Sequence, residues 1–184
     1  FDWDSSAEED SSFWSLVGGI GQRSTTTSKS GAKSWKFNFV GGSLHYQAGM
    51  EMSESAEVKK KMALVSGARY VFSAYFKVTG KIGIITHPFA ALNILTRYSV
   101  DTFLTTPVMH RLKVDNTMLL NEWVYKEVEF VAPVQENGWF LSYFERLHEQ
   151  NDDFSAEIYV DDVSLQLLDG HAGATVRRCN HNLD

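Results

Sequence analysis

Two adjacent carboxylates, Asp161 and Asp162, stand inside an otherwise apolar stretch that runs from residue 158 to residue 165. Neighbouring carboxylates repel each other, and burying either one without a partner is costly. A bound Ca²⁺ ion would resolve this conflict, because it is held by about six to eight oxygen atoms of carboxylates and backbone carbonyls. The alternative is an aspartate pair at a strand bulge, where the carboxylates are solvated or paired with lysine or arginine.

A second kind of chemistry, sugar recognition, is suggested by aromatic residues that alternate with polar ones. Sugars present apolar C–H faces and a rim of hydroxyl groups, so a binding surface needs exposed flat rings beside hydrogen-bonding groups. The stretch 70–78 alternates between an apolar row and a mixed row that holds Ser73, Tyr75 and Lys77. If the apolar row faces the core, Tyr75 faces outward, flanked by the other two. We therefore predict that these three residues face a ligand.

The stretch 139–146 is aromatic on both of its alternating rows. One row holds Trp139 and Tyr143 and the other holds Phe140 and Phe144, so the sequence alone does not identify the buried row. We predict Trp139 and Tyr143 as ligand-facing. Lesser candidates are Arg97, Tyr98 and the polar run 148–151. The residues expected to pack in the core instead are Trp35 and Trp123.

Catalytic arrangements are weak in this sequence. Glu127 and Glu129 would share one face of a strand at about 7 Å, which is compatible with glycoside hydrolysis but common on solvated strands. Cys179 and His181 near the end of the chain do not have a usual zinc spacing. Residues of the kind that a polysaccharide lyase needs show no lyase motif: Tyr98, His87, His110 and Arg111. We therefore predict no catalytic residues.

The elements that must position these side chains are short strands. Turn-forming Gly, Pro, Asn and Asp separate about ten segments at roughly 8–12-residue spacing, which is typical of an all-β sandwich. The segment 54–65 is the only plausible helix, and we favour a loop followed by a strand there. The clearest predicted strands are 33–40, 70–78, 81–86, 92–98, 108–114, 123–131, 139–146 and 156–168.

Composition narrows the function classes. The chain has 184 residues, of which 43% are hydrophobic and 13% aromatic, and its formal net charge is −6. The acidic balance disfavours nucleic acid as a partner, and no apolar run approaches the roughly 20 residues that span a bilayer. A single cysteine excludes a scaffold of internal disulfides. We expect one domain over residues 1–168, followed by a tail or linker at 169–184.

The order of several short motifs resembles the jelly-roll carbohydrate-binding modules of the CBM4/9/16/22 type, which share a galactose-binding-like β-sandwich. Each motif is short, and together they span residues 1–168. The resemblance rests on the opening Phe1-Asp2 pair, the Ser-Gly stretch 28–35, the Gly-x-x-Tyr strand 67–77, Trp123 in a late strand, and the closing Asp-Asp-Val strand 159–165. Two departures are Asp in place of Glu in the opening pair and a longer, irregular region at 80–120.

The resemblance implies an all-β jelly-roll of two antiparallel sheets and a non-catalytic module that binds polysaccharide. Tyr75 stands at the position of a ligand-facing aromatic in these modules. Such a module would tether a larger extracellular protein, with further domains, to a glycan. The resemblance also implies a structural calcium ion whose ligands match Asp2, the loop residues Lys29, Gly31 and Lys33, and Asp161 or Asp162.

Two other functions stay open at this point. The same fold could serve as a structural or adhesion module that contacts proteins in an extracellular assembly. It could also carry a polysaccharide lyase or glycoside hydrolase. The run Lys59-Lys60-Lys61, if it lies at the rim of a binding cleft, would favour an anionic polysaccharide.

Overall fold

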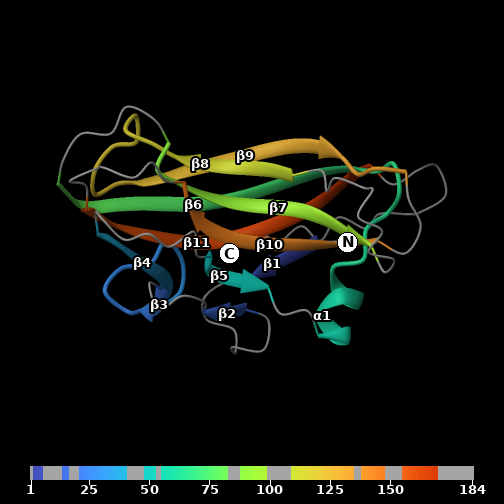
Figure 1. Ribbon diagram of the computed structural model, residues 1–184, viewed down its shortest axis with the longest axis horizontal. Helices are drawn as coiled ribbons and strands as arrows, with labels where there is room; N and C mark the ends of the chain where they lie inside the picture. Colours follow the sequence, from blue (N-terminus) through green and yellow to red (C-terminus); the bar gives the residue numbers. More distant parts are fainter. Residues whose placement is uncertain are drawn as a thin grey trace, which may run out of the picture.

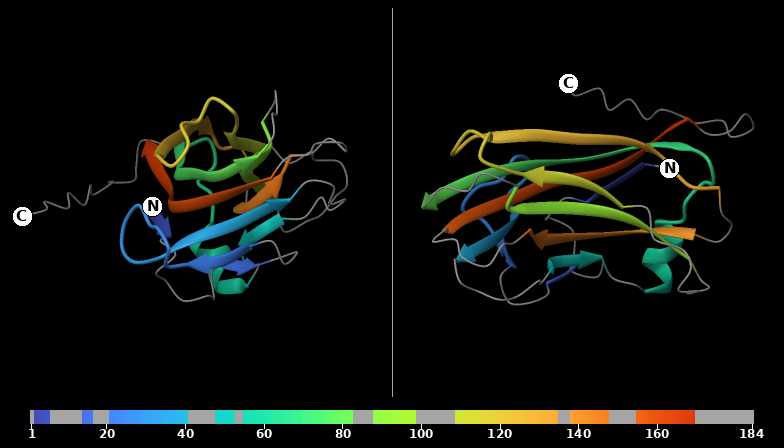
Figure 2. Two further views of the ribbon diagram at one scale, coloured as in Figure 1. Left: turned by 90° about the vertical axis from the view of Figure 1, so that its left-hand side faces the viewer. Right: turned by 45° about the horizontal axis from the view of Figure 1, so that its top comes forward.

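Two antiparallel sheets form the molecule, which confirms the predicted all-β sandwich class (Figures 1 and 2). The computed structural model describes residues 2–5, 14–16, 21–40, 48–52, 55–82, 88–98, 109–134, 138–147 and 155–169. The six-stranded sheet contains β3 (Gly21–Ser24), β4 (Ser34–Val40), β11 (Ser155–Asp169), β6 (Arg69–Ile82) and β9 (Trp123–Val131) in that order, with β1 (Asp2–Ser5) also paired to β11. The five-stranded sheet contains β2 (Trp14–Leu16), β5 (Ala48–Met52), β10 (Gly138–Arg146), β7 (Ala90–Tyr98) and β8 (Met109–Val114) in that order.

Alternation of apolar residues along the strands places the core between the two sheets. Phe72 and Phe76 of β6 are fully buried, as the period of two predicts. Phe37 of β4 stacks on Phe144 of β10 with ring centroids 4.2 Å apart, so aromatic contacts join the two sheets. Trp35 is also buried in this core, as predicted.

The core also decides which row of β10 faces outward. Phe140 and Phe144 are buried between the sheets, whereas Trp139 and Tyr143 are half-buried and lie on the opposite face of the strand. Their orientation is the one that the ligand-facing prediction requires.

The long strand β11 has two different partners along one edge. β4 pairs with its first part, up to Val160, and β1 pairs with its second part, from Val163 to Gln166. Between them, the register of β11 against β6 shifts after Asp161, and Asp162 has a positive φ of 48°. The aspartate pair therefore occupies a bulge at the junction of two strands.

Two local predictions are wrong. Residues Ala56–Lys61 form a short helix, α1, in place of the expected loop and strand. The Ser55 side chain accepts a hydrogen bond from the Val58 N–H, and Val58 is buried, so a cap and one apolar contact decide the conformation. β6 also continues through Gly80, where a turn was expected, and Gly80 adopts a φ of 59° within the strand.

Within the described ranges, no helix is long and apolar enough to cross a membrane. Of the predicted tail 169–184, Asp169 is the last residue of β11, and residues 170–184 lie outside the described residues.

Candidate functional site

The outward-facing side chains of β10, β7 and β8 form continuous rows on the five-stranded sheet, which we call the β10 face. Strand pairing places Trp139 opposite Arg97, and Tyr143 opposite Asn93. Asn93 is in turn opposite Arg111 of β8. Directly opposed residues in an antiparallel pair have Cβ atoms about 5 Å apart, so aromatic, amide and guanidinium groups lie side by side on this face.

Four buried polar atoms on the β10 face have no hydrogen-bond partner among the described residues. One of them, Oε1 of Glu145, has an ion-pair contact with Arg111, and the other three are Oδ1 of Asn93, Nε of Arg97 and Nε1 of Trp139. Leaving a buried polar atom unpaired costs about 1–3 kcal/mol, and such atoms are rare in native structures. Two donors and one acceptor gathered on one sheet face are the groups that hydroxyls of a bound molecule would satisfy.

The two aromatic rings of this face are held by their neighbours. The ammonium of Lys59 on α1 lies 4.6 Å from the Trp139 ring centroid. The Tyr143 hydroxyl lies 3.4 Å from the Sδ atom of Met109. Residues just after α1 also pair with β10, because the Phe140 N–H donates to the Met62 carbonyl. The helix therefore fixes one border of the face, next to Trp139.

The charged pair of this face is Arg111 and Glu145. Their closest atoms, Nη2 and Oε1, lie 3.3 Å apart, and the side chains of Arg111 and Glu145 are 35% and 22% exposed. Since Arg111 is opposite Asn93, the pair orders the polar side chains at the end of the face remote from Trp139.

The outer face of the six-stranded sheet, which we call the β6 face, carries the other predicted ligand residues. Tyr75 lies with its ring centroid 5.1 Å from that of Tyr125, and the Lys29 ammonium lies 4.9 Å from the Tyr75 centroid. Lys77 donates to the Thr27 hydroxyl at 3.2 Å. Tyr75 and Lys77 therefore make their contacts with other residues of the protein.

Trp123 and Ser73 also lie on the β6 face. Trp123 is half-exposed and opposite Lys77, so the prediction that it packs in the core is wrong. It occupies the outward phase of β9, whose inward residues are Val124, Val128 and Phe130. Ser73 is largely buried in its outward row, next to Tyr75.

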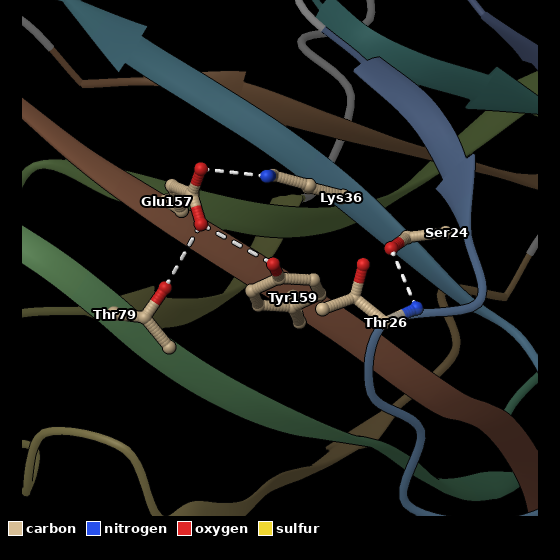
Figure 3. A network of polar contacts seen from close by, with 6 residues as sticks. All are labelled: Ser24, Thr26, Lys36, Thr79, Glu157 and Tyr159. Atoms are coloured by element: carbon tan, nitrogen blue, oxygen red, sulfur yellow. Dashed lines mark hydrogen bonds and ion pairs between the residues drawn. The ribbon is translucent and has the colours of Figure 1, made fainter.

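A hydrogen-bonded network on β4, β6 and β11 satisfies the polar groups around Glu157 on the β6 face (Figure 3). Glu157 accepts from Lys36 at 2.6 Å and from the hydroxyls of Thr79 and Tyr159, both at 3.2 Å. The Lys36 hydrogen bond holds the pKa of Glu157 below its usual value, and the same bond raises the pKa of Lys36. Nearby, the Thr26 N–H donates to the Ser24 hydroxyl (Figure 3).

The structure thus divides the predicted ligand residues between two opposite faces. Tyr75, Lys77 and Ser73 are on the β6 face, whereas Trp139, Tyr143 and Arg97 are on the β10 face. Tyr98 ends β7, and its side chain is outside the described set, as are residues 148–151.

Asn93 is the site residue that sequence reasoning missed. Its signal is a lone amide in the apolar run Ala90–Leu95, four residues before Arg97 and therefore on the same face of β7.

Asp161 contacts the loop before β4 through direct hydrogen bonds. Its buried carboxylate accepts from the backbone N–H groups of Lys29 at 2.7 Å, Ser30 at 3.3 Å and Asp162 at 2.9 Å. Burial raises the pKa of Asp161, and the hydrogen bond from Lys29 acts in the opposite direction. Asp162 accepts from the Ser30 hydroxyl, so both aspartates tie the loop to β11.

The implied calcium ligands fit only in part. The Asp161 carboxylate and the loop before Gly31 lie together, but the contacts that join them are backbone N–H groups of Lys29 and Ser30 that donate to the carboxylate. Asp2, however, is opposite Gln166, four residues beyond Asp162 and roughly 13 Å along the strand. Among the described residues there is no group of three or more His, Cys, Asp and Glu side chains that could hold a metal ion. The calcium ion, with Lys33 as a further ligand, stays a prediction.

The weaker catalytic candidates have structural partners. Glu127 accepts from the Tyr125 hydroxyl at 2.8 Å, and Glu129 forms an ion pair with Arg69. His110 stacks on Phe130 with centroids 4.3 Å apart, and burial lowers its pKa. The residues His87, Cys179 and His181 lie outside the described part of the chain.

Solved carbohydrate-binding modules share this fold. A structure named as a Family 16 Carbohydrate Binding Module-2 matches with a TM-score of 0.50 and 20% identity, over 83% of this chain and 89% of that one. The CBM22-1 xylan-binding domain of Paenibacillus barcinonensis Xyn10C matches with a TM-score of 0.55 and 15% identity, over 92% and 95%. The CBM22-1–GH10 modules of Clostridium thermocellum xylanase 10B, complexed with xylohexaose, match with a TM-score of 0.53 and 13% identity, over 95% of this chain and 29% of that one.

No protein-family model matches the sequence, and no curated protein matches it either. The similarity therefore establishes the carbohydrate-binding-module fold, as the sequence motifs predicted. The ligand has to be inferred from the residues of the site.

Proposed function

We propose that this chain is a non-catalytic module that binds polysaccharide on the β10 face. The observation that carries this proposal is the set of three buried, unpartnered polar atoms on Asn93, Arg97 and Trp139, next to the Trp139 and Tyr143 rings. A sugar offers what such a face lacks, because its hydroxyl groups both donate and accept while its C–H faces pack on aromatic rings.

Each side chain has a defined part in this proposal. In this proposal the Trp139 Nε1–H and Arg97 Nε–H donate to sugar hydroxyl oxygens, and the Asn93 Oδ1 accepts from a sugar hydroxyl. These three atoms are buried in the free protein, so the side chains around them must shift when the sugar binds. The Tyr143 ring packs against a sugar ring. Leu141, two residues before Tyr143 on the same face of β10, is buried. Rows that cross three strands suit an elongated ligand such as a polysaccharide chain.

The similar structures support the same class of ligand. Their names include a xylan-binding domain and a module complexed with xylohexaose, and the latter is joined to a GH10 module. By analogy, we propose that this module tethers a larger extracellular protein to its glycan. The ligand and the attached domains of those proteins do not transfer by fold alone.

We also propose the structural calcium ion at Asp161. Support comes from a buried carboxylate with a raised pKa that contacts the loop residues Lys29 and Ser30, next to the implied ligand Gly31. Calcium should raise the melting temperature at pH 7, and a chelator should reverse this. The effect should fade in acid, because protons compete as the pH falls through the folded pKa, which lies above 3.8. No calcium effect at pH 7 would contradict the site.

The function is tested by binding to a panel of soluble polysaccharides in affinity gels, followed by titration calorimetry. Trp139→Ala should weaken binding of the best ligand by about 30-fold or more, since central aromatic contacts contribute at least about 2 kcal/mol. Tyr75→Ala, an aromatic removed from the opposite face, is the matched control and should leave the affinity unchanged. Loss of binding in Tyr75→Ala alone would move the site to the β6 face.

A further inference from the structure

Two cations of the β10 face lie at its Trp139 end, whereas Arg111 and Lys113 of β8 lie toward its other end. Arg97 is directly opposite Trp139 on β7, and Lys59 of α1 lies over the Trp139 ring. The Arg97 Nε is buried and has no hydrogen-bond partner among the described residues. The chain as a whole has a net charge of −6, so this concentration of positive charge is not a general property of its surface.

Two acidic residues stand on the strands of this face, both away from its Trp139 end: Glu51 of β5 is opposite Tyr143, and Glu145 is on β10. Glu145 is paired with Arg111 and is six residues from Trp139 along β10, roughly 20 Å on an extended strand. Neutral sugar hydroxyls can pair with one N–H of Arg97, but a guanidinium presents a planar fork of donors that matches a carboxylate with two parallel hydrogen bonds. A half-buried arginine with an unpaired Nε is therefore better satisfied by an anionic sugar than by a neutral one.

We propose that the β10 face recognises a polysaccharide that carries uronic acid residues, with the uronate carboxylate bound by Arg97 next to Trp139. This inference rests on the proposed function and specifies its ligand. Lys59 adds a second positive charge at the same end, above the ring on which the sugar would pack. The carboxylate would give Arg97 the partner that its Nε lacks among the described residues.

The test compares acidic polysaccharides with their own carboxyl-reduced forms, which keep the chain length and linkage but lose the charge. Polygalacturonate, alginate and glucuronoxylan, each in both forms, would be titrated at low and moderate salt. We expect at least one acidic polymer to bind about tenfold or more tightly than its reduced form, as charged hydrogen bonds commonly allow. Arg97→Gln should abolish this difference, and Arg97→Lys should retain part of it.

The matched control is Arg69→Gln, which removes the same charge from the β6 face. It should leave the preference for the acidic polymer intact, and thermal melts would confirm that each variant is folded. A dextran sulfate arm separates carboxylate from sulfate recognition, and equal dependence of both on Arg97 would overturn the uronate assignment.

Two further outcomes overturn the inference and distinguish it from the proposed function. If every acidic polymer and its reduced form bind equally well, with binding lost in Trp139→Ala, the sugar site stands and the uronate assignment fails. If no polysaccharide of either kind binds, both fail together.

Discussion

The two outer faces of this sandwich carry similar residues in opposite states. Both present aromatic rings beside cations, and both lie on strands of good alternation. On the β6 face, the ring of Tyr75 lies beneath Lys29, and the polar atoms of Glu157 are shared among three partners. On the β10 face, polar atoms of Asn93 and Arg97 are buried without a partner.

The difference shows what separates a structural face from a binding face. A satisfied polar network stabilises the free protein and gains little from a ligand, because a new hydrogen bond must replace an existing one. A polar network with unpaired atoms lowers the stability of the free protein. A ligand that pairs those atoms removes this destabilisation, which adds to the binding free energy. Aromatic content alone did not distinguish the two faces.

The largest effect on stability should come from removing the Asp161 carboxylate in the six-stranded sheet. Asp161→Ala leaves the N–H groups of Lys29 and Ser30 without their acceptor, and should lower the free energy of unfolding by about 3 kcal/mol. Chemical denaturation would measure it. Asp162→Asn keeps a residue type that tolerates a positive φ, so it should cost much less. Polysaccharide affinity should be unchanged in any Asp161→Ala protein that remains folded, and a selective loss of binding would contradict the division.

Asn93→Leu tests the β10 face in the same way. It removes the unpartnered Oδ1 from a fully buried position, so the folded protein should gain about 1 kcal/mol in stability while polysaccharide binding weakens by about tenfold. Denaturant titration and calorimetry on the same sample would show both. A less stable protein with unchanged affinity would mean that Asn93 is already satisfied in the free state.

The smallest effect concerns pH and Glu157. Because its pKa is depressed by Lys36, the ionised form contributes stability that is fully present above the ordinary value of 4.5 and is lost as the pH falls through the lower folded pKa. Glu157 is exposed enough for solvent screening, so the contribution is about 0.5 kcal/mol. Comparing the acid unfolding of wild type and Glu157→Gln would measure it. An identical acid transition in the two proteins would remove this network from the account.

Sequence patterns predicted the strands because each has one buried row, as in β4, β6 and β9. They could not orient β10, since both of its rows are aromatic and only packing against Phe37 decides between them. They placed Tyr75 outward but could not show that Trp139 lies on the opposite sheet, because the side of the sandwich depends on strand order. The helix α1 and the satisfied state of the β6 face depend on contacts between distant segments.

The most direct test of this account is an amide NMR titration with the polysaccharide fragment that binds best. The account predicts chemical-shift changes along Ala91–Arg97, Met109–Lys113 and Trp139–Glu145, which make up the β10 face. Changes confined to Val71–Lys77 and Trp123–Glu129 would place the ligand on the β6 face and contradict the central claim.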